Sequence, residues 1–289
     1  MPNIQKNTIK QHYVPQVYLK GFSQDKKRIY RFDIAHENQI TQPVAISSVC
    51  YKKNMYELSD GKGKNIVPNY IENVLGEFEA HFNFYMTKLK ETAYKKSSNK
   101  IKFLSDSQEN AFWIAYIAIQ ILRTPEILSV SNNCLVEFFK NKLPLEKIRA
   151  FSLAQCLPFF SEITPESNTV YTTIINSLCD LSFVVGIDKR DRIFTSDNPV
   201  FCQGSSLDNI EKVIFPLSSD LVLFLVGKNY CDTFQQILFY EINNIDVEEI
   251  NWSISRVAKS CILSKYLLEE AEIKQIKQAQ QDKKNSEEN

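Results

Sequence analysis

Glycine is scarce in this chain, with 7 residues among 289. The sequence contains neither GxGxxG nor GxxxxGKS/T, the glycine-rich loops with which dinucleotide-binding and P-loop proteins hold phosphates. Histidine is scarcer still, at 3 residues, and neither GxSxG nor HExxH occurs. The chain therefore lacks the common sequence signatures of nucleotide-binding proteins, serine hydrolases and zinc proteases.

An excess of charge of either sign is also missing. Lys plus Arg and Asp plus Glu both number 34, so the formal net charge is zero. A strongly basic chain would favour nucleic acid through the release of counterions, and this composition does not. No apolar run reaches the ~20 residues of a membrane-spanning helix, and the N-terminus lacks the apolar core of a signal peptide. We expect a cytoplasmic protein with no membrane segment.

The cysteines form no recognisable pattern. There are 7, an odd number, scattered through the chain without a CxxC pair. This argues against a disulfide framework and against a zinc ribbon, and we expect most of them to be small buried apolar groups. A metal site needs several clustered carboxylates or histidines, and the sequence shows no such cluster, so we predict no metal.

The N-terminal part is predicted to be mostly extended. In Gln11–Phe22, QHYVPQVYLKGF, Pro15 restricts the preceding residue to extended conformations. One apolar helical turn is expected after it, ended by Gly21. Alternating apolar residues predict a strand over residues 27–34, with further extended pieces at 39–49 and 54–58.

The middle of the chain is predicted to be helical. Apolar residues recur at steps of three and four over residues 69–94, and Ser107–Leu122 is apolar nearly all round, which is typical of a buried helix. Pro125 suits the first turn of the next helix, with Thr124 as its cap. Residues 126–160 are predicted to be helical with breaks at Pro144 and Pro158, and a further helix is expected at 171–179.

The C-terminal part changes character. Short β-branched and aromatic runs, separated by polar turns, predict strands at residues 181–188, 192–197, 212–219, 221–228 and 235–242. A helix is predicted over Asn244–Leu263. The segregation of strands and helices favours an α+β fold with a mixed or antiparallel C-terminal sheet. We predict a flexible segment at 1–10, one domain at 11–265, and a polar helical or disordered tail at 266–289.

Four short motifs resemble a known family. They are HYVPQVYLKGF near the N-terminus, RTP at 123–125, SDNPV at 196–200 and FPLSS at 215–219. Together they resemble the bacterial family known as domain of unknown function 4238, whose hallmark is an N-terminal HYVP motif. The resemblance covers roughly residues 11–265, and Asn251 lies where that family carries an asparagine-bearing helix. It implies one integrated domain and does not imply a reaction.

Three residues from these motifs are candidates for catalysis. His12 is a candidate for proton transfer, because imidazole titrates near neutral pH. Arg123 ends an apolar helix and is a candidate for holding an anionic group through its guanidinium. Asp197 follows a predicted strand, where it would orient His12 or Arg123. Whether burial or a neighbouring carboxylate decides the pKa of His12 is left open.

Four further residues are predicted to surround this site and bind substrate: Tyr13, Gln16, Asn198 and Asn251. Cys202 is a weaker candidate, as a nucleophile with His12 as its base. A purely structural explanation is open beside each of these. SDNP is also a common turn sequence, and Arg123 could form a structural ion pair with Asp197. In that case the same residues form a buried polar network that joins the helices to the sheet.

The function expected from His12, Arg123 and Asp197 is that of an enzyme-like effector acting on a phosphate-containing substrate. Nuclease-like phosphodiester cleavage without a metal, in phage defence or toxicity, fits proton transfer combined with charge stabilisation. A nucleotide-dependent transferase using NAD fits the same groups. A non-catalytic sensor or binding module that recognises a phage or host component suits the neutral charge equally well. The sequence identifies no cofactor and no oligomeric state.

Overall fold

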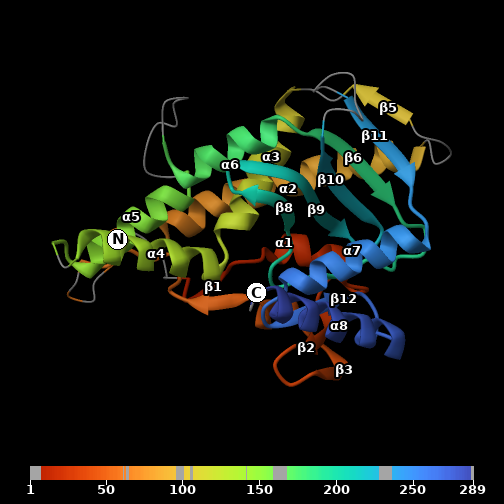
Figure 1. Cartoon of the computed structure of the whole chain (residues 1–289), viewed down its shortest axis with the longest axis horizontal. Helices are drawn as coiled ribbons and strands as arrows, with labels where there is room; N and C mark the ends of the chain where they lie inside the picture. Colours follow the sequence, from red (N-terminus) through yellow and green to blue (C-terminus); the bar gives the residue numbers. More distant parts are fainter. Residues whose placement is uncertain are drawn as a thin grey trace, which may run out of the picture.

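The computed structural model describes residues 8–60, 62, 65–95, 101–104, 107–140, 142–158, 168–227 and 236–287. Its strands form three sheets, of six, four and two strands, and helices pack around them (Figure 1). The predicted α+β class is confirmed, because N-terminal strands are followed by a helical middle, a C-terminal mixed sheet and late helices.

The largest sheet is mixed. Its strands, in spatial order, are β5 (Ile101–Leu104), β11 (Gln236–Glu241), β6 (Ser182–Ile187), β10 (Leu221–Val226), β9 (Asn209–Ser218) and β8 (Phe201–Ser206). β11 runs parallel to β6, and the other neighbouring pairs are antiparallel. Every residue of β6 is buried, as expected for a strand covered on both faces.

Helices from the middle of the chain cover one face of this sheet. They are α2 (Tyr70–Lys95) and α3 (Ser107–Leu122), with α6 (Val170–Cys179) packed against α3, while α7 (Asn244–Val257) lies on the opposite face (Figure 1). Tyr18 joins these layers. Its ring stacks on Phe215 of β9 at 5.3 Å between centroids and meets Phe82 of α2 at 6.2 Å. Its hydroxyl donates to the carbonyl oxygen of Pro216 at 2.7 Å. The aromatic part of the N-terminal motif is therefore part of the core.

Two smaller sheets contain the N-terminal strands. β1 (Lys10–His12) pairs with β4 (Tyr51–Lys53), and α1 (Gln16–Leu19) leads into a 3-10 turn, η1 (Lys20–Phe22). The four-stranded sheet has the order β3 (Asn38–Ala45), β2 (Arg28–Asp33), β12 (Cys261–Ser264) and β7 (Thr195–Ser196), and a second 3-10 turn, η2 (Ile46–Ser48), follows β3. α8 (Glu270–Glu287) packs against α7 and buries Ile276 and Ala279.

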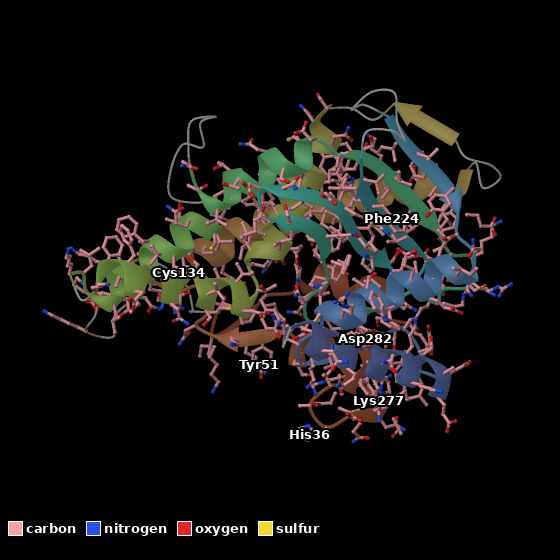
Figure 2. All side chains as sticks on the ribbon, in the orientation of Figure 1. His36, Tyr51, Cys134, Phe224, Lys277 and Asp282 are labelled. Carbon is pink, nitrogen blue, oxygen red and sulfur yellow. The ribbon has the colours of Figure 1, made fainter. Side chains whose placement is uncertain are left out.

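A helical hairpin projects from one end of the molecule. It consists of α4 (Pro125–Phe139) and α5 (Leu145–Cys156), and Cys134 marks the outer part of α4 (Figures 1 and 2). The predicted break at Pro144 is confirmed. No residue of α4 is fully buried: one side of the helix is partly covered, where it packs against α5, and the other side is exposed. The last predicted residues of this helical stretch, 159 and 160, lie outside the described residues.

Two local predictions in the N-terminal part are wrong. Residues 54–58 form no strand, because Asn54 turns the chain with a φ of 50° and Tyr56 then donates its amide to the side chain of Gln11. Gly21 does not end the helical turn, since η1 runs through it. A Cβ on Gly21 would lie 2.9 Å from the carbonyl oxygen of Leu217, so glycine is needed here for close approach to β9.

The helix predicted over Asn244–Leu263 is too long. α7 ends at Val257, and the chain then extends into β12. The amides of Lys259 and Ser260 donate to the carboxylate of Asp197 instead of to carbonyls one turn back. A side chain more than sixty residues away in sequence therefore ends this helix, which apolar spacing within the segment does not reveal.

Within the described residues, no single helix is both long and apolar enough to cross a bilayer. α3 and α4 meet those limits only when taken together, and they are bent by 69° at the break between them.

Candidate functional site

His12 ends β1 of the two-stranded sheet, where it pairs with Tyr51 of β4. The two rings lie 5.7 Å apart between centroids, and the imidazole is 9% exposed. Its Nε2 has no hydrogen-bond partner within the described chain. Burial lowers the pKa of His12 below its ordinary value, against a hydrogen bond to the main chain of Ser47. The imidazole is therefore neutral at neutral pH, which answers the question that the sequence left open.

Arg123 lies beneath this motif and is 1% exposed. Its guanidinium donates to the main-chain oxygen of His12 and, at 3.1 Å, to a carboxylate oxygen of Glu79 on α2. Burial acts to lower the pKa of Arg123, but Tyr56 and Glu79 raise it overall, so the group stays charged. Arg123 thus joins α3 to the backbone of the motif and to α2. Its recorded ion pair is with Glu79, not with Asp197.

The carboxylate of Asp197 is fully engaged by one loop. It accepts hydrogen bonds from the amide of Lys259 at 2.9 Å, and from the amide and hydroxyl of Ser260 at 3.0 and 2.7 Å. The amide of Cys261 adds a longer contact at 3.4 Å. These bonds hold the entry to β12 against the end of β7, so Asp197 orients neither His12 nor Arg123.

The predicted asparagines also tie segments together. Asn198 donates to the carbonyl oxygen of Val257 at the end of α7 at 3.1 Å. Asn251 accepts from the amide of Phe194 at 3.2 Å and donates to the carbonyl oxygen of Arg192 at 3.1 Å. These are typical bonds of buried side-chain amides to the main chain.

A pocket brings together three of the seven predicted residues. It has a volume of about 410 Å³ and lies between the start of α4 and the loop before β12. Its lining includes Tyr13, Asp197 and Asn198, together with Thr124, which directly follows Arg123. His12, Arg123, Gln16 and Asn251 are not among its lining residues, and Gln16 is exposed on α1. The structure therefore gathers part of the predicted site and separates the rest.

A family model matches residues 10–265 of the chain, and its description reads "Protein of unknown function (DUF4238)". The chain belongs to the DUF4238 family. Neither the curated proteins nor the solved structures contain a match. The resemblance inferred from the HYVP, RTP, SDNPV and FPLSS motifs is thereby confirmed, and the family description itself names no activity.

A second pocket adjoins the first in this DUF4238 protein. It has a volume of about 310 Å³ and shares Lys52, Pro125 and Ser129 with the first pocket. We call the two together the α4 groove. Its basic side chains are Lys52, Lys53, Arg149 and Lys259, and its acidic side chains are Glu126 and Asp197.

The basic residues of the groove differ in whether their charged groups are bound to other parts of the protein. Lys52 and Lys53 lie on β4 and are exposed. Arg149 donates to the carbonyl oxygen of Met55 at 2.6 Å, and Lys259 forms an ion pair with Glu126 at 2.6 Å. Sequence reasoning missed all four, because they come from three separate segments. Only the adjacent Lys52 and Lys53 offered a local signal.

The start of α4 adds a positive end of a helix dipole to the groove. Thr124 occupies the cap position, as predicted, but its side chain makes no capping bond and donates instead to the carbonyl oxygen of Ile121. Pro125 has no amide hydrogen. The next amides of the first turn therefore receive no side-chain cap from Thr124, which favours a negatively charged group at this end.

Sequence reasoning also missed Glu72. This residue of α2 has a buried carboxylate oxygen with no partner in the described part of the protein. Burial raises the pKa of Glu72 to about 7, against the opposing charge of Arg123, while Glu79 and Glu57 add to the rise. Glu72 therefore titrates near neutral pH, beside the Arg123 network and outside the α4 groove.

The remaining candidates give little support to catalysis. Burial raises the pKa of Cys202 to about 12, so its thiol stays protonated and is a poor nucleophile. His36 lies at the tip of the β2–β3 turn (Figure 2). His81 is exposed on α2. Among the described residues, no group of three or more His, Cys, Asp or Glu side chains is placed to hold a metal ion.

Proposed function

We propose that this protein binds a phosphate-containing ligand in the α4 groove, with a nucleotide or a short single-stranded oligonucleotide as the ligand class. The observation that carries the proposal is the convergence of Lys52, Lys53 and Lys259 with the uncapped start of α4 on two adjoining pockets. Each pocket is close to the lower end of the volumes typical of ligand sites. Because the net charge of the whole chain is zero, the positive charge of the groove is a local feature of this surface.

The groove offers more than charge. Ser129 and Asn132 supply polar groups along α4, and Tyr13 adds an aromatic ring to the lining of the groove. Lysine binds phosphate as a point charge, and helix amides donate to its oxygens. The pair between Lys259 and Glu126 lies in the same wall, so an incoming phosphate competes with Glu126 for Lys259. Such competition favours ligands with more than one negative charge.

Binding has stronger support than catalysis. Proton transfer in phosphodiester cleavage requires an acid or a base within hydrogen-bond reach of the reacting atoms. The imidazole of His12 does not line the groove, and the carboxylate of Asp197 is engaged by three or more donors. Nuclease-like cleavage and NAD-dependent transfer therefore stay predictions, and both require the binding step proposed above.

The proposal is tested by fluorescence anisotropy with a labelled ten-nucleotide single-stranded DNA, and by calorimetry with ATP. The double variant Lys52→Glu/Lys53→Glu is expected to weaken binding at least tenfold, because each exposed lysine is replaced by a repelling charge. Lys26→Glu/Lys27→Glu is the matched control, since it reverses an adjacent lysine pair outside the groove and is expected to bind like the wild type. Equal weakening by both variants, or no binding of either probe to the wild type, would reject the proposal.

The same labelled oligonucleotide reports cleavage. Shortened product formed by the wild type and lost in His12→Ala, with binding retained, would support the catalytic prediction. Binding without product would leave the protein as a sensor or binding module.

A further inference from the structure

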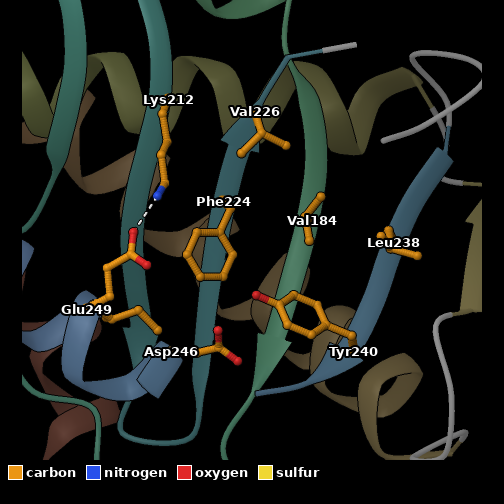
Figure 3. A pocket seen from close by; sticks show the side chains of 9 residues that line it. Val184, Lys212, Phe224, Val226, Leu238, Tyr240, Asp246 and Glu249 are labelled. Carbon is orange, nitrogen blue, oxygen red and sulfur yellow. Dashed lines mark hydrogen bonds and ion pairs between the residues drawn. The ribbon is translucent and has the colours of Figure 1, made fainter. Parts of the chain in front are cut away.

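A separate pocket lies on the face of the six-stranded sheet that carries α7 (Figure 3). Its volume is about 280 Å³. Four neighbouring strands and one helix line it, and Figure 3 shows the side chains of the strands pointing toward the viewer while α2 and α3 lie behind the sheet. Its lining residues are Val184, Lys212, Phe224, Val226, Leu238, Tyr240, Asp246, Glu249 and Ile250. None of them lines the α4 groove.

The floor of this pocket is apolar and rigidly placed. Val184 and Leu238 come from paired positions of β6 and β11, and Phe224 lies opposite Val184 on β10. The rings of Phe224 and Tyr240 are 6.4 Å apart between centroids, with an angle of 31° between their planes. A floor of this kind, built on hydrogen-bonded strands, suits the flat apolar body of a ligand of about one ring.

The rim carries an excess of negative charge. Lys212 forms an ion pair with Glu249 at 2.7 Å, so these two charges compensate one another. Asp246 remains as the uncompensated charge of the lining. One of its oxygens accepts from the amide of Asn243 at 2.8 Å, which fixes the carboxylate at the first turn of α7. In Figure 3 this carboxylate lies below the ring of Phe224 and to the left of the ring of Tyr240, at the edge of the apolar floor.

We propose that the pocket binds a small monocationic amine with an apolar, single-ring body. The ring lies over Val184, between Phe224 and Leu238, and the ammonium group lies at Asp246, where it gains the carboxylate beside Phe224 and Tyr240. A carboxylate or phosphate of the same size is repelled by the same rim. The site therefore has the opposite charge preference to that proposed for the α4 groove, and it does not depend on that proposal.

The test uses titration calorimetry with phenethylamine and with 3-phenylpropionate, which share a phenyl ring and differ in the sign of their charge. Saturable one-to-one binding of the amine, at least tenfold tighter than that of the acid, is expected. Two variants locate the site. Val226→Trp places a large ring in the pocket and is expected to abolish binding. Asp246→Asn keeps an oxygen for the amide of Asn243 and is expected to weaken binding about tenfold, the scale of one charge-assisted hydrogen bond.

Leu207→Trp is the matched control, because Leu207 is an exposed apolar residue outside the lining of the pocket. It is expected to bind the amine like the wild type, and circular dichroism checks that all variants are folded. If Val226→Trp is misfolded, the binding of the amine to Asp246→Asn alone decides whether the site lies in this pocket. The proposal is overturned if the wild type shows no saturable binding of the amine, if the acid binds as tightly as the amine, or if folded Val226→Trp or Asp246→Asn binds the amine unchanged.

Discussion

Two polar regions meet near the start of α4 and use their charges differently. The guanidinium of Arg123, beneath the groove, and the carboxylate of Asp197, which also lines the groove, are both directed at other parts of the protein. In the α4 groove above, Lys52 and Lys53 direct theirs at solvent. The first region is conspicuous in the sequence, through the RTP and SDNP motifs, and the second is not.

Buried, paired charges and exposed charges are expected to serve different purposes, the first in folding and the second in binding. A buried charge has to be paired or hydrogen-bonded, because its desolvation is costly, and its partners are then no longer available to a ligand. An exposed lysine stabilises the fold little and keeps its donors for a ligand. We therefore expect changes in the buried network to alter stability first, and changes in the groove to alter binding first.

The largest effect is expected for Arg123→Ala. This change removes the donor of the His12 carbonyl and the ion-pair partner of Glu79. Breaking a buried ion pair by removing one partner costs about 3–5 kcal/mol, so the free energy of unfolding is expected to fall by that amount. Urea denaturation measures it. Arg190→Ala is the control, since Arg190 is exposed. A loss below about 1 kcal/mol would contradict a structural role for this ion pair.

The next effect is expected for Asp197→Asn. The amide group turns a donor toward the amides of Lys259 and Ser260, where the carboxylate accepted from both. Leaving such groups unsatisfied costs about 1–3 kcal/mol, and thermal unfolding measures the loss. Asn198→Ala, which removes a single neutral bond, is the milder comparison. Unchanged stability combined with lost ligand binding would move Asp197 from the structural network to the functional site.

A smaller effect, with a pH dependence, is expected for Glu72→Gln. Because folding raises the pKa of Glu72 to about 7, the stability tied to its protonated form is present at low pH and is lost as the pH rises through 7. Between pH 5 and pH 8, the free energy of unfolding of the wild type is therefore expected to fall by roughly 1–2 kcal/mol more than that of Glu72→Gln, after allowance for solvent screening. Exposed Glu77, on the same helix, is the control. Parallel stability curves for wild type and Glu72→Gln would contradict this.

The smallest effect is expected for Gln16→Ala. Gln16 belongs to the HYVPQ motif, but its side chain is exposed and lines neither pocket of the α4 groove. A change of less than about 0.5 kcal/mol in stability, with unchanged ATP and oligonucleotide binding, is expected. Tyr18→Phe is the contrast within the same motif, because it removes the buried bond to Pro216. A measurable loss of binding in Gln16→Ala would show that the ligand extends beyond the groove.

The helices were predicted well because their signal is local. The apolar spacing in Ser107–Leu122 and the prolines at 125 and 144 act within a few residues, and the structure reproduces each of them. Strands were located less well. β8 was not predicted, since its residues are largely exposed at the edge of the sheet and show no apolar alternation.

The candidate site was predicted only in part, because its residues were chosen by type and motif. Tyr13, Asp197 and Asn198 line one pocket, without His12 and Arg123. The direction in which each polar group points was not visible in the sequence. The guanidinium of Arg123 donates to the carbonyl of His12 and not to its imidazole, which depends on where the end of α3 lies relative to β1.

The sequence by itself determined the family, the α+β class and the positions of most helices, since motif identity and apolar periodicity are properties of neighbouring residues. Only the tertiary structure decided where α7 ends and which charges remain available to a ligand. Asp197 captures the amides at 259 and 260, and Lys52 joins Lys259 beside α4, through contacts between segments far apart in the chain. Such contacts depend on how whole elements pack, because burial and hydrogen bonding, and not local propensity, determine which polar groups face solvent.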